Sequence, residues 1–196
     1  MSFALVVNIA QFVERKFSMA IKLIKLTKEY QRQLTEMMDE WVAFNAENPD
    51  ANTSPFAIFR GDYKNNFETY VRDLYDNDSL IAKGYVPATT LFLYDDERDI
   101  FLGATNIRHY LNEGLLYCGG HIGDGIRPSE RRKGYATLQI KLSLEVCKEL
   151  GIDRVLICCD KDNIGSRKSI ISNGGVKENE VPHEGSITER YWIDIK

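Results

Sequence analysis

The stretch Gly119–Leu150, GGHIGDGIRPSERRKGYATLQIKLSLEVCKEL, joins a glycine-rich segment, a run of cations and an amphipathic pattern. Arg131, Arg132 and Lys133 directly precede Gly134, where a helix is predicted to begin. A helix N-terminus presents unpaired N–H groups and roughly half a positive charge, so cations beside it need an anion to offset the repulsion. Glycine leaves this turn open to close approach because it has no Cβ atom. The pattern therefore predicts a phosphate-binding site.

Two titratable side chains, His121 and Asp124, lie in the glycine-rich segment before the cations. Either one has the chemistry to take a proton from a nucleophile. The structural alternatives are a histidine hydrogen-bonded within a sheet and an aspartate that caps a bulge. The glycines at 119, 120, 123 and 125 are typical of a strand that bulges or admits a ligand backbone, although a loosely packed edge strand is a second interpretation.

Hydrophobic periodicity indicates the elements that must position these residues. The predicted order is a strand at 20–26, helices beginning at 27 and within 65–78, a hairpin at 88–111, a strand at 114–127, a helix at 134–150, a strand at 153–160, a helix at 162–174 and a last strand at 186–195. This order predicts a single α/β domain with a mixed, mostly antiparallel sheet and helices on both faces.

The first predicted strand begins in the alternating segment MAIKLIKLT, which starts at Met19. We interpret residues 1–18 as a possible N-terminal extension, either native or the result of a misplaced start, and residues 19–196 as the domain. The chain has no apolar span of 18 residues, and no basic leader precedes the first apolar run. Neither a membrane helix nor a signal peptide is therefore expected.

Composition narrows the kind of partner. The 196 residues carry a formal net charge of -4, which argues against nucleic-acid binding through a broad basic surface. The four cysteines show no metal-ligand spacing, so no metal site is expected. Cys158 and Cys159 are adjacent on a predicted strand and must point to opposite faces, which fits small buried side chains in a reducing cytoplasm.

Residues Arg131–Ala136 fit the pattern Arg-x-x-Gly-x-Ala between a strand and a helix. Here the chain resembles the GCN5-related N-acetyltransferase (GNAT) family, whose acyl-CoA signature is Gln/Arg-x-x-Gly-x-Gly/Ala. Ile126 and Pro128 match the hydrophobic residue and proline that precede the signature in that family. Downstream, the family commonly has an asparagine, a small residue three positions later and a glycine eleven positions later. In this chain the downstream match is Asn163, Ser166 and Gly174.

The resemblance implies that acetyl-CoA is the cosubstrate and that its acetyl group passes directly to an amine. It implies that the pantetheine arm lies between two splayed strands and that the turn before the helix binds the pyrophosphate. The cofactor-binding residues it implies are Ile126, Arg131, Arg132, Lys133, Gly134, Tyr135, Ala136, Asn163 and Ser166. His121 is the first choice as general base, with Asp124 as the second, acting directly or through water.

The general acid is left open, because many relatives have a tyrosine seven residues after the asparagine and this chain has Ile170 there. Ser166 and Tyr191 are alternatives, but neither is supported by spacing. No cysteine is expected to act as nucleophile, since a thiol in apolar surroundings has a raised pKa. A non-catalytic acyl-CoA-binding sensor or scaffold remains the main alternative function.

Other functional classes fit the sequence less well. The segment Gly120–Gly125 has the glycine spacing of a nucleotide P-loop, but Ile126 and Arg127 stand where Lys and Ser/Thr are required. The chain also lacks the glycine fingerprint of a dinucleotide fold and the aromatic platform of an RNA-binding protein. The acceptor is expected to be an amine on a small molecule or peptide, with acidic segments hinting at a cationic one, and a homodimer is possible.

Overall fold

The computed structural model describes residues 20–51 and 53–195, so the predicted extension over 1–18 lies outside the described residues. The strands are β1 (Ile21–Ile24), β2 (Ala88–Asp95), β3 (Ile100–Arg108), β4 (Ile122–Ile126), β5 (Arg154–Asp160), β6 (Val176–His183) and β7 (Ser186–Asp194). The helices are α2 (Gln31–Glu47), α3 (Phe67–Leu74), α4 (Asn77–Ala82), α5 (Glu113–Tyr117), α6 (Tyr135–Glu149) and α7 (Ile164–Ser172). Three short 3₁₀ turns are η1 (Lys28–Tyr30), η2 (Phe56–Phe59) and η3 (Pro128–Glu130).

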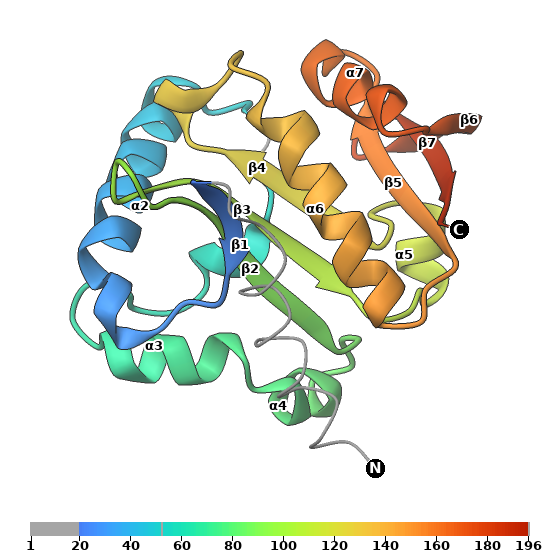
Figure 1. The fold of residues 1–196 in the computed structure, drawn as a ribbon. Helices are drawn as coiled ribbons and strands as arrows, with labels where there is room; N and C mark the ends of the chain where they lie inside the picture. The colour runs from blue at the N-terminus through green and yellow to red at the C-terminus, as the bar shows by residue number, and fades with distance from the viewer. Residues whose placement is uncertain (1–19, 52, 196) are drawn as a thin grey trace.

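The strands form two antiparallel sheets, one in the order β1-β2-β3-β4 and the other in the order β5-β7-β6 (Figure 1). Helices cover both faces of the larger sheet, with α2 on one side and α6 on the other. The predicted α/β architecture is therefore confirmed.

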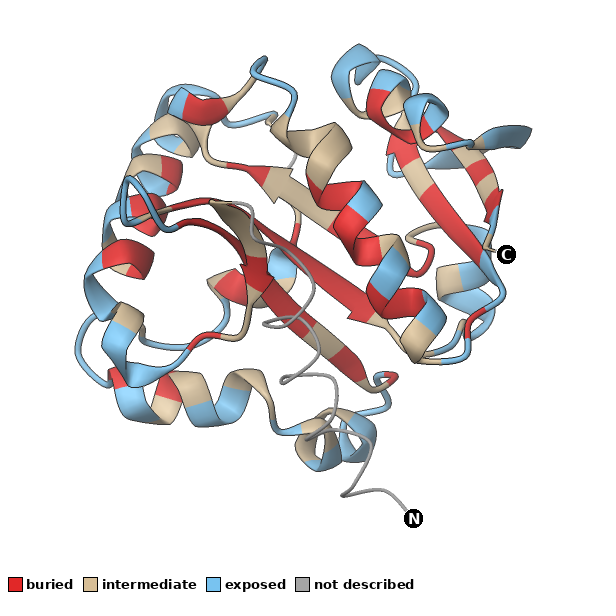
Figure 2. Ribbon diagram, viewed as in Figure 1, coloured by how far each residue is buried: buried red, intermediate tan, exposed pale blue. Residues whose placement is uncertain are grey.

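Alternation along β2 produces the two cores. Leu91 and Leu93 pack with residues of α6, whereas Phe92 and Tyr94 pack with residues of α2. Successive side chains of a strand point to opposite faces, so a strand buried on both sides reads as a continuous apolar run. Figure 2 shows the resulting band of buried residues through the central strands and along the inner surfaces of the helices.

Two local predictions were wrong, and two elements were missed. Residues 113–117 form the short helix α5 rather than the start of a strand, because the Asn112 side chain accepts a hydrogen bond from the Leu115 N–H (2.9 Å) and caps the helix. Cys118 therefore follows a helix and does not begin the glycine strand. The sequence analysis also missed the six-residue helix α4, which has no buried residue. It missed the strand β6 as well, because almost all side chains of β6 are exposed and show little apolar pattern.

Gly103 lets α6 lie close to the sheet. A Cβ atom at this position would lie 2.5 Å from the Gly125 carbonyl oxygen, 2.7 Å from Oε1 of Gln139 and 2.8 Å from Cδ1 of Ile126. Gln139 is fully buried, and its Nε2 donates to the Ala104 carbonyl oxygen at 3.0 Å. The contact of the sheet with α6 therefore requires a residue without a side chain.

We expect Gly103→Ala to lower the free energy of unfolding by about 1–3 kcal/mol, because the added methyl group overpacks a backbone contact. Gly114→Ala in α5 is the matched control, since its new Cβ atom would meet nothing closer than 3.7 Å. The control should be neutral or slightly stabilising, as alanine favours helix over glycine. Urea unfolding of both variants measures the difference. An equal response of the two would show that the close approach at Gly103 is not a constraint.

Candidate active site

The two sheets meet where β4 and β5 come together at one end. The main-chain N–H of His121 donates to the Leu156 carbonyl oxygen at 2.7 Å, and the Leu156 N–H donates to Nδ1 of the His121 ring at 3.0 Å. Beyond this point β4 belongs to one sheet and β5 to the other, and the two strands lie on either side of α6 in Figure 1. We call the divergence of β4 and β5 beyond His121 and Leu156 the strand fork.

The strand fork exposes the main chain of β4 to a ligand. The Arg108 N–H donates to the His121 carbonyl, and the Arg127 N–H donates to the Leu102 carbonyl, each at 2.8 Å. In an antiparallel ladder, alternate residues direct their main-chain groups to opposite sides. The N–H and C=O groups of Ile122, Asp124 and Ile126 are therefore directed away from β3, toward the strand fork.

The glycines of this segment are required by close contacts. Gly120 has φ +65°, and a Cβ atom there would lie 2.4 Å from the Leu156 carbonyl oxygen. A Cβ atom on Gly125 would lie 1.9 Å from the Ser54 carbonyl oxygen and 2.8 Å from the Trp41 ring. Both glycines are therefore in tight packing, which does not fit the interpretation of a loosely packed edge strand.

The first turn of α6 has no side-chain cap. Gly134 occupies the N-cap position with φ +88° and makes no side-chain hydrogen bond, whereas α3, α4, α5 and α7 are each capped by Asn or Asp. The N–H groups of Tyr135, Ala136 and Thr137 have no partner within a helix, by the geometry of an α-helix N-terminus. This end of α6 is therefore available to an anion.

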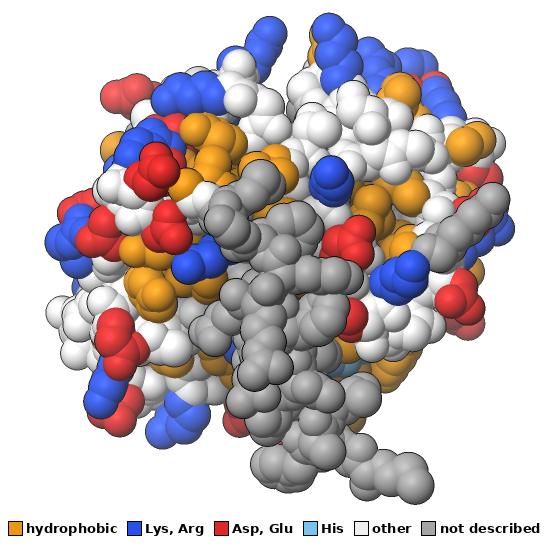
Figure 3. Space-filling view, in the orientation of Figure 1, with side chains coloured by type: hydrophobic (Ala, Val, Ile, Leu, Met, Phe, Trp, Pro, Cys, Tyr) orange, Lys and Arg blue, Asp and Glu red, His pale blue; other side chains and the backbone are white. Residues whose placement is uncertain are grey.

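The predicted cations differ in their surroundings. The Arg131 guanidinium lies 4.3 Å from the centre of the Phe44 ring, and its Nε donates to the Ile126 carbonyl oxygen at 3.2 Å. Lys133 forms an ion pair with Glu130 (3.0 Å), while Arg132 is exposed with φ +68°. Figure 3 shows Lys and Arg side chains on both sides of a notch in the upper edge of the molecule.

Glu40 of α2 fixes the turn that leads from β4 to α6. Its carboxylate accepts hydrogen bonds from Nε of Arg127, from the Ser129 N–H (2.6 Å) and from the Ser129 hydroxyl (3.1 Å). Burial opposes ionisation of Glu40, but Arg127 and Ser129 hold the pKa of its carboxyl below the usual value. The turn before the expected phosphate site is thereby tied to α2.

Asn163 and Ser166 lie together at the start of α7. The Asn163 side chain accepts a hydrogen bond from the Ser166 N–H at 3.1 Å and so caps the helix. Ile170, at the position of the expected tyrosine, is fully buried in the core beside α6. The Tyr191 hydroxyl donates to Glu189 at 2.8 Å, and burial together with Glu189 raises the pKa of Tyr191 to about 12. Ile170 has no acidic proton, and the Tyr191 hydroxyl already donates to Glu189, so neither residue supplies an acid at the strand fork.

His121 and Asp124 lie in different electrostatic environments. Burial lowers the pKa of His121 to about 4, and Arg108 adds to the effect. Because Nδ1 accepts the Leu156 N–H, the neutral ring carries its proton on Nε2. Burial raises the pKa of Asp124 to about 6, although Arg108 and Gln139 oppose the shift. Of the two, the carboxyl of Asp124 titrates close to neutral pH.

The cysteines are poor nucleophiles. Burial raises the pKa of Cys158 to about 11 and the pKa values of Cys147 and Cys159 to about 12. Burial also raises the pKa of Cys118, despite its hydrogen bond to Thr188. A covalent route through a thiolate would therefore start from a form that is scarce at neutral pH.

The sequence reading did not single out Arg108 or Gln139, although both lie beside β4. Nη1 of Arg108 donates to the Gly119 carbonyl oxygen at 3.1 Å, and Gln139 lies under β4 from α6. In the sequence, the only local signal for either residue was a polar side chain on an otherwise apolar face of a strand or helix. In the described part of the chain, no group of three or more His, Cys, Asp or Glu side chains is arranged to hold a metal ion. No helix within 20–51 and 53–195 is long and apolar enough to cross a membrane.

The geometry defines a fold that can hold an extended, phosphate-bearing ligand between two strands and a helix N-terminus. The model of the Acetyltransferase (GNAT) domain matches residues 27–176. The chain belongs to the GNAT acetyltransferase family, so the resemblance seen in the sequence is confirmed. A comparison with curated protein sequences finds no match.

Solved acetyltransferase structures share the fold. The ribosomal-protein-S5-alanine acetyltransferase from Vibrio fischeri has a TM-score of 0.66 at 13% identity, covering 91% of this chain and 95% of that chain. The microcin C7 self-immunity acetyltransferase MccE, in complex with acetyl-CoA and AMP, has a TM-score of 0.60 at 17% identity, covering 89% and 92%. RimL, the ribosomal L7/L12 α-N-protein acetyltransferase, has a TM-score of 0.59 at 16% identity, covering 92% and 93%.

We expect Asp124→Asn to raise the free energy of unfolding by about 2 kcal/mol at pH 7.5 and to have little effect at pH 4. The folded protein binds a proton at Asp124 more tightly than the unfolded chain does, because burial raises the pKa of this carboxyl to about 6. The free energy of unfolding of the wild type therefore falls as the pH rises from about 4 to about 6. The Asp124→Asn variant has no carboxyl at this position and avoids the loss. Urea unfolding at the two pH values measures it. A gain of the same size at both would contradict a buried, titrating Asp124.

Proposed function

We propose that this protein binds acetyl-CoA in the strand fork and transfers the acetyl group directly to the amine of a small molecule or peptide. The observation that carries the proposal is that two binding features, the main chain of β4 and the N-terminus of α6, follow one another in space. The main-chain side of β4 that does not pair with β3 leads directly, through η3, to the uncapped N-terminus of α6, and within the described chain only its last carbonyl, that of Ile126, already accepts a hydrogen bond, from Arg131. An extended amide-bearing arm followed by a pyrophosphate matches this order of hydrogen-bonding groups.

The pyrophosphate contacts come mainly from the main chain. The N–H groups at the start of α6 act as donors, and Gly134 leaves open space, since a Cβ atom there would meet nothing within 4 Å. Arg132 and Lys133 are exposed and can reach the phosphates from the turn, whereas Arg131 supports the turn from beneath. Asn163 and Ser166 lie at the start of α7, which directly follows β5. MccE, which has this fold, was solved with acetyl-CoA bound.

We assign the general base to Asp124 in preference to His121. The Asp124 carboxylate takes a proton from the acceptor ammonium, directly or through water, and the free amine attacks the thioester carbonyl carbon. A tetrahedral intermediate forms. As its C–S bond breaks, the nitrogen gives its second proton to the departing CoA thiolate, so that the amide and the CoA thiol are released. His121 lacks a free basic nitrogen while Nδ1 accepts the Leu156 N–H. The role of His121 in this proposal is to hold the closed end of the strand fork.

The chemistry does not depend on a tyrosine acid. Ile170 occupies that position in the core, and a thiol leaving group with a pKa near about 8.5 departs with little assistance. The raised pKa values of the cysteines support transfer within a ternary complex rather than through an acetylated enzyme. We further propose that the protein acts in the cytoplasm without a metal ion or nucleic acid, with a homodimer as a possible state.

The second candidate is a module that binds acyl-CoA and transfers nothing. The observation that favours it is the buried isoleucine at the position of the expected acid. Release of free CoA thiol in the presence of amines separates the two functions. A binding module would hold CoA and release no thiol with any amine tested.

We expect Gly134→Glu to weaken CoA binding by at least about tenfold, because the new carboxylate would repel the pyrophosphate and occupy its approach. Gly151→Glu is the matched control. It lies at the other end of α6, also has a positive φ (+75° against +88°), and also has open space around its Cβ position. Titration calorimetry on both variants gives the result. Equal CoA affinity in the two would move the site away from this helix N-terminus.

We expect the acidic limb of the kcat/KM profile to lie near pH 6, where Asp124 titrates, and to disappear in Asp124→Asn together with most of the activity. The rate should fall as the pH drops through about 6, since the base is then protonated. CoA affinity should stay unchanged, which separates loss of the base from loss of the site. A limb that survives in Asp124→Asn would remove this residue from the role.

A further inference from the structure

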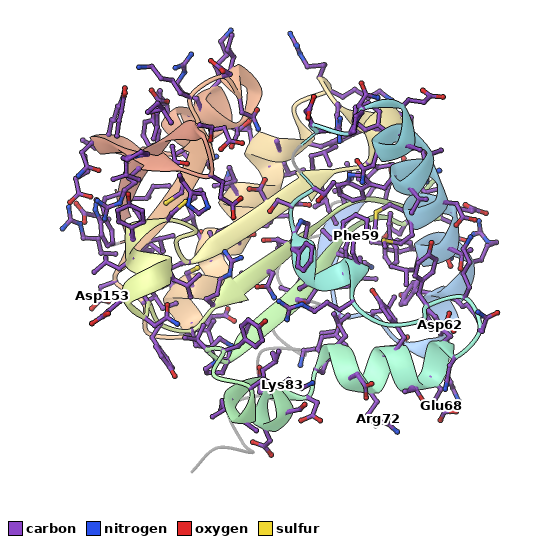
Figure 4. All side chains as sticks on the ribbon, turned by 180° about the vertical axis from the view of Figure 1, so that it is seen from behind. Phe59, Asp62, Glu68, Arg72, Lys83 and Asp153 are labelled. Carbon is purple, nitrogen blue, oxygen red and sulfur yellow. The ribbon has the colours of Figure 1, made fainter. Side chains whose placement is uncertain are left out.

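A pocket of about 750 Å³ lies on the α2 side of the larger sheet. Its floor is formed by Ala88 and Thr90 of β2 and by Asn106 and Arg108 of β3, which face one another in the antiparallel register. Its walls come from η2, the end of α3, α4 and the start of α5. In Figure 4, Phe59 marks η2 and Lys83 marks the end of α4, on two sides of this pocket. The pocket is large enough for a ligand of metabolite size.

Arg108 brings a cation to the pocket floor. Its Nη1 donates to the carbonyl oxygens of Gly119 (3.1 Å) and Gly120 (3.4 Å), and burial lowers the pKa of its guanidinium. Among the described residues, no carboxylate forms an ion pair with it. A guanidinium has five N–H donors, so this one keeps donors for a ligand.

Arg60 adds a second cation beside the first. Its guanidinium lies between two aromatic rings, 5.6 Å from the centre of the Phe56 ring and 4.8 Å from that of Tyr85. It is close enough to Arg108 to lower the pKa of that side chain further. No carboxylate of the described chain pairs with Arg60 either. The Asp124 carboxylate acts on Arg108 through space without forming an ion pair with it. Two neighbouring arginines that lack an ion-paired carboxylate among the described residues favour an anion between them.

The acidic residues at the rim are already engaged. Asp73 forms an ion pair with Arg72 at 2.9 Å, and Asp76 caps α4 by accepting the Ser79 N–H at 2.9 Å. Lys83 also lines the pocket and adds positive charge. The side chains that remain available to a ligand are therefore cationic, aromatic and amide or hydroxyl groups.

The floor of the pocket adjoins β4 through Arg108. A Cβ atom on Gly123 would lie 2.9 Å from Nη2 and 3.0 Å from Nη1 of Arg108, so the guanidinium lies directly against β4. Gly123 is flanked by Ile122 and Asp124, whose main-chain groups are directed to the strand fork. If Arg108 binds the anionic group of a ligand, an amine one or two bonds from that group would therefore lie beside the strand fork.

We propose that this pocket binds the acceptor, and that the acceptor is an amine carrying a nearby anionic group, either a carboxylate or a phosphate. The inference rests on the proposed acetyl transfer and names the class of substrate. It replaces the cationic amine suggested by the acidic segments of the sequence. Carboxylates in those segments are paired within the protein, including Asp39 with Lys64 and Asp95 with Arg98.

The test compares probe amines that differ only in the anionic group. The pairs are phenylalanine with phenylalaninamide, β-alanine with β-alaninamide, and O-phosphoethanolamine with ethanolamine. Thiol release from acetyl-CoA gives kcat/KM, and the shift in unfolding temperature gives binding without turnover. We expect at least one acidic member to exceed its neutral partner by about tenfold or more. The pair that responds distinguishes a carboxylate from a phosphate.

Arg108→Gln should reduce that preference to about threefold or less, with Arg108→Lys intermediate, because only arginine offers a bidentate fork. Arg32→Gln is the control and should keep the full preference, because Arg32 of α2 is exposed and neither it nor its partners Glu36 and Asp99 line the pocket. CoA affinity, measured on each variant, shows that the fold and cosubstrate site are intact.

Two results would overturn the inference. One is a wild-type protein that binds CoA and treats acidic and neutral partners alike, or favours the neutral ones. The other is an equal loss of preference in the Arg32 and Arg108 variants. Failure to bind CoA would instead contradict the proposed transfer. The thermal shift with the acidic amine alone would then still decide whether the pocket binds an anion.

Discussion

The junction between His121 and Leu156 is the interaction on which the rest of the site depends. It joins the two sheets through one main-chain hydrogen bond and one from Leu156 to the imidazole ring. The ring satisfies a strand donor that would otherwise lack a partner as β4 leaves β5. A buried unpaired N–H costs about 1–3 kcal/mol, so this contact stabilises the start of the strand fork. Gly120 makes the approach possible because a side chain there would overlap the Leu156 carbonyl.

This role explains why the histidine is poorly suited to proton transfer. A ring that accepts a main-chain hydrogen bond on Nδ1 has its proton fixed on Nε2, and its burial disfavours the charged form. Asp124 is three residues further along, where the strands have separated, and its carboxyl is only partly compensated by Arg108 and Gln139. One strand thus supplies a structural residue at the closed end of the strand fork and a titrating residue along its side.

Charge is distributed differently on the two sides of β4. In the turn that leads from β4 to α6, several cations already have partners: Arg127 binds Glu40, and Glu130 binds both Arg98 and Lys133. Phosphate recognition there depends on main-chain N–H groups, which provide direction without adding net charge. On the side of α2, Arg60 and Arg108 line one pocket, and neither forms an ion pair with a carboxylate of the described residues. Two anionic molecules, or two anionic ends of them, can therefore approach β4 from opposite faces.

The sequence by itself determined the elements whose signals are local. The hairpin of β2 and β3, the helix α6 and the signature Arg131–Ala136 all follow from alternation, helical spacing and turn residues within short windows. Elements with weak local signals were not found. β6 is almost entirely exposed, and α5 depends on a single capping side chain at Asn112. The resemblance to the GNAT family was visible because its motif is contiguous.

Only the tertiary structure decided which functional groups meet and how they ionise. Arg60 and Arg108 are far apart in the sequence, and neither stands in a recognisable pattern, yet packing of η2 against the ends of β2 and β3 brings them to one pocket. From the sequence, His121 is preferred to Asp124 as general base, although both are titratable residues on one strand and nothing local shows their environments. In the folded protein the pKa of His121 is about 4 and that of Asp124 is about 6, which reverses the usual order of histidine and aspartate. Desolvation disfavours the charged form of each group, so it lowers the pKa of a base and raises that of an acid. Desolvation arises from the surrounding elements, and no local window of sequence contains it.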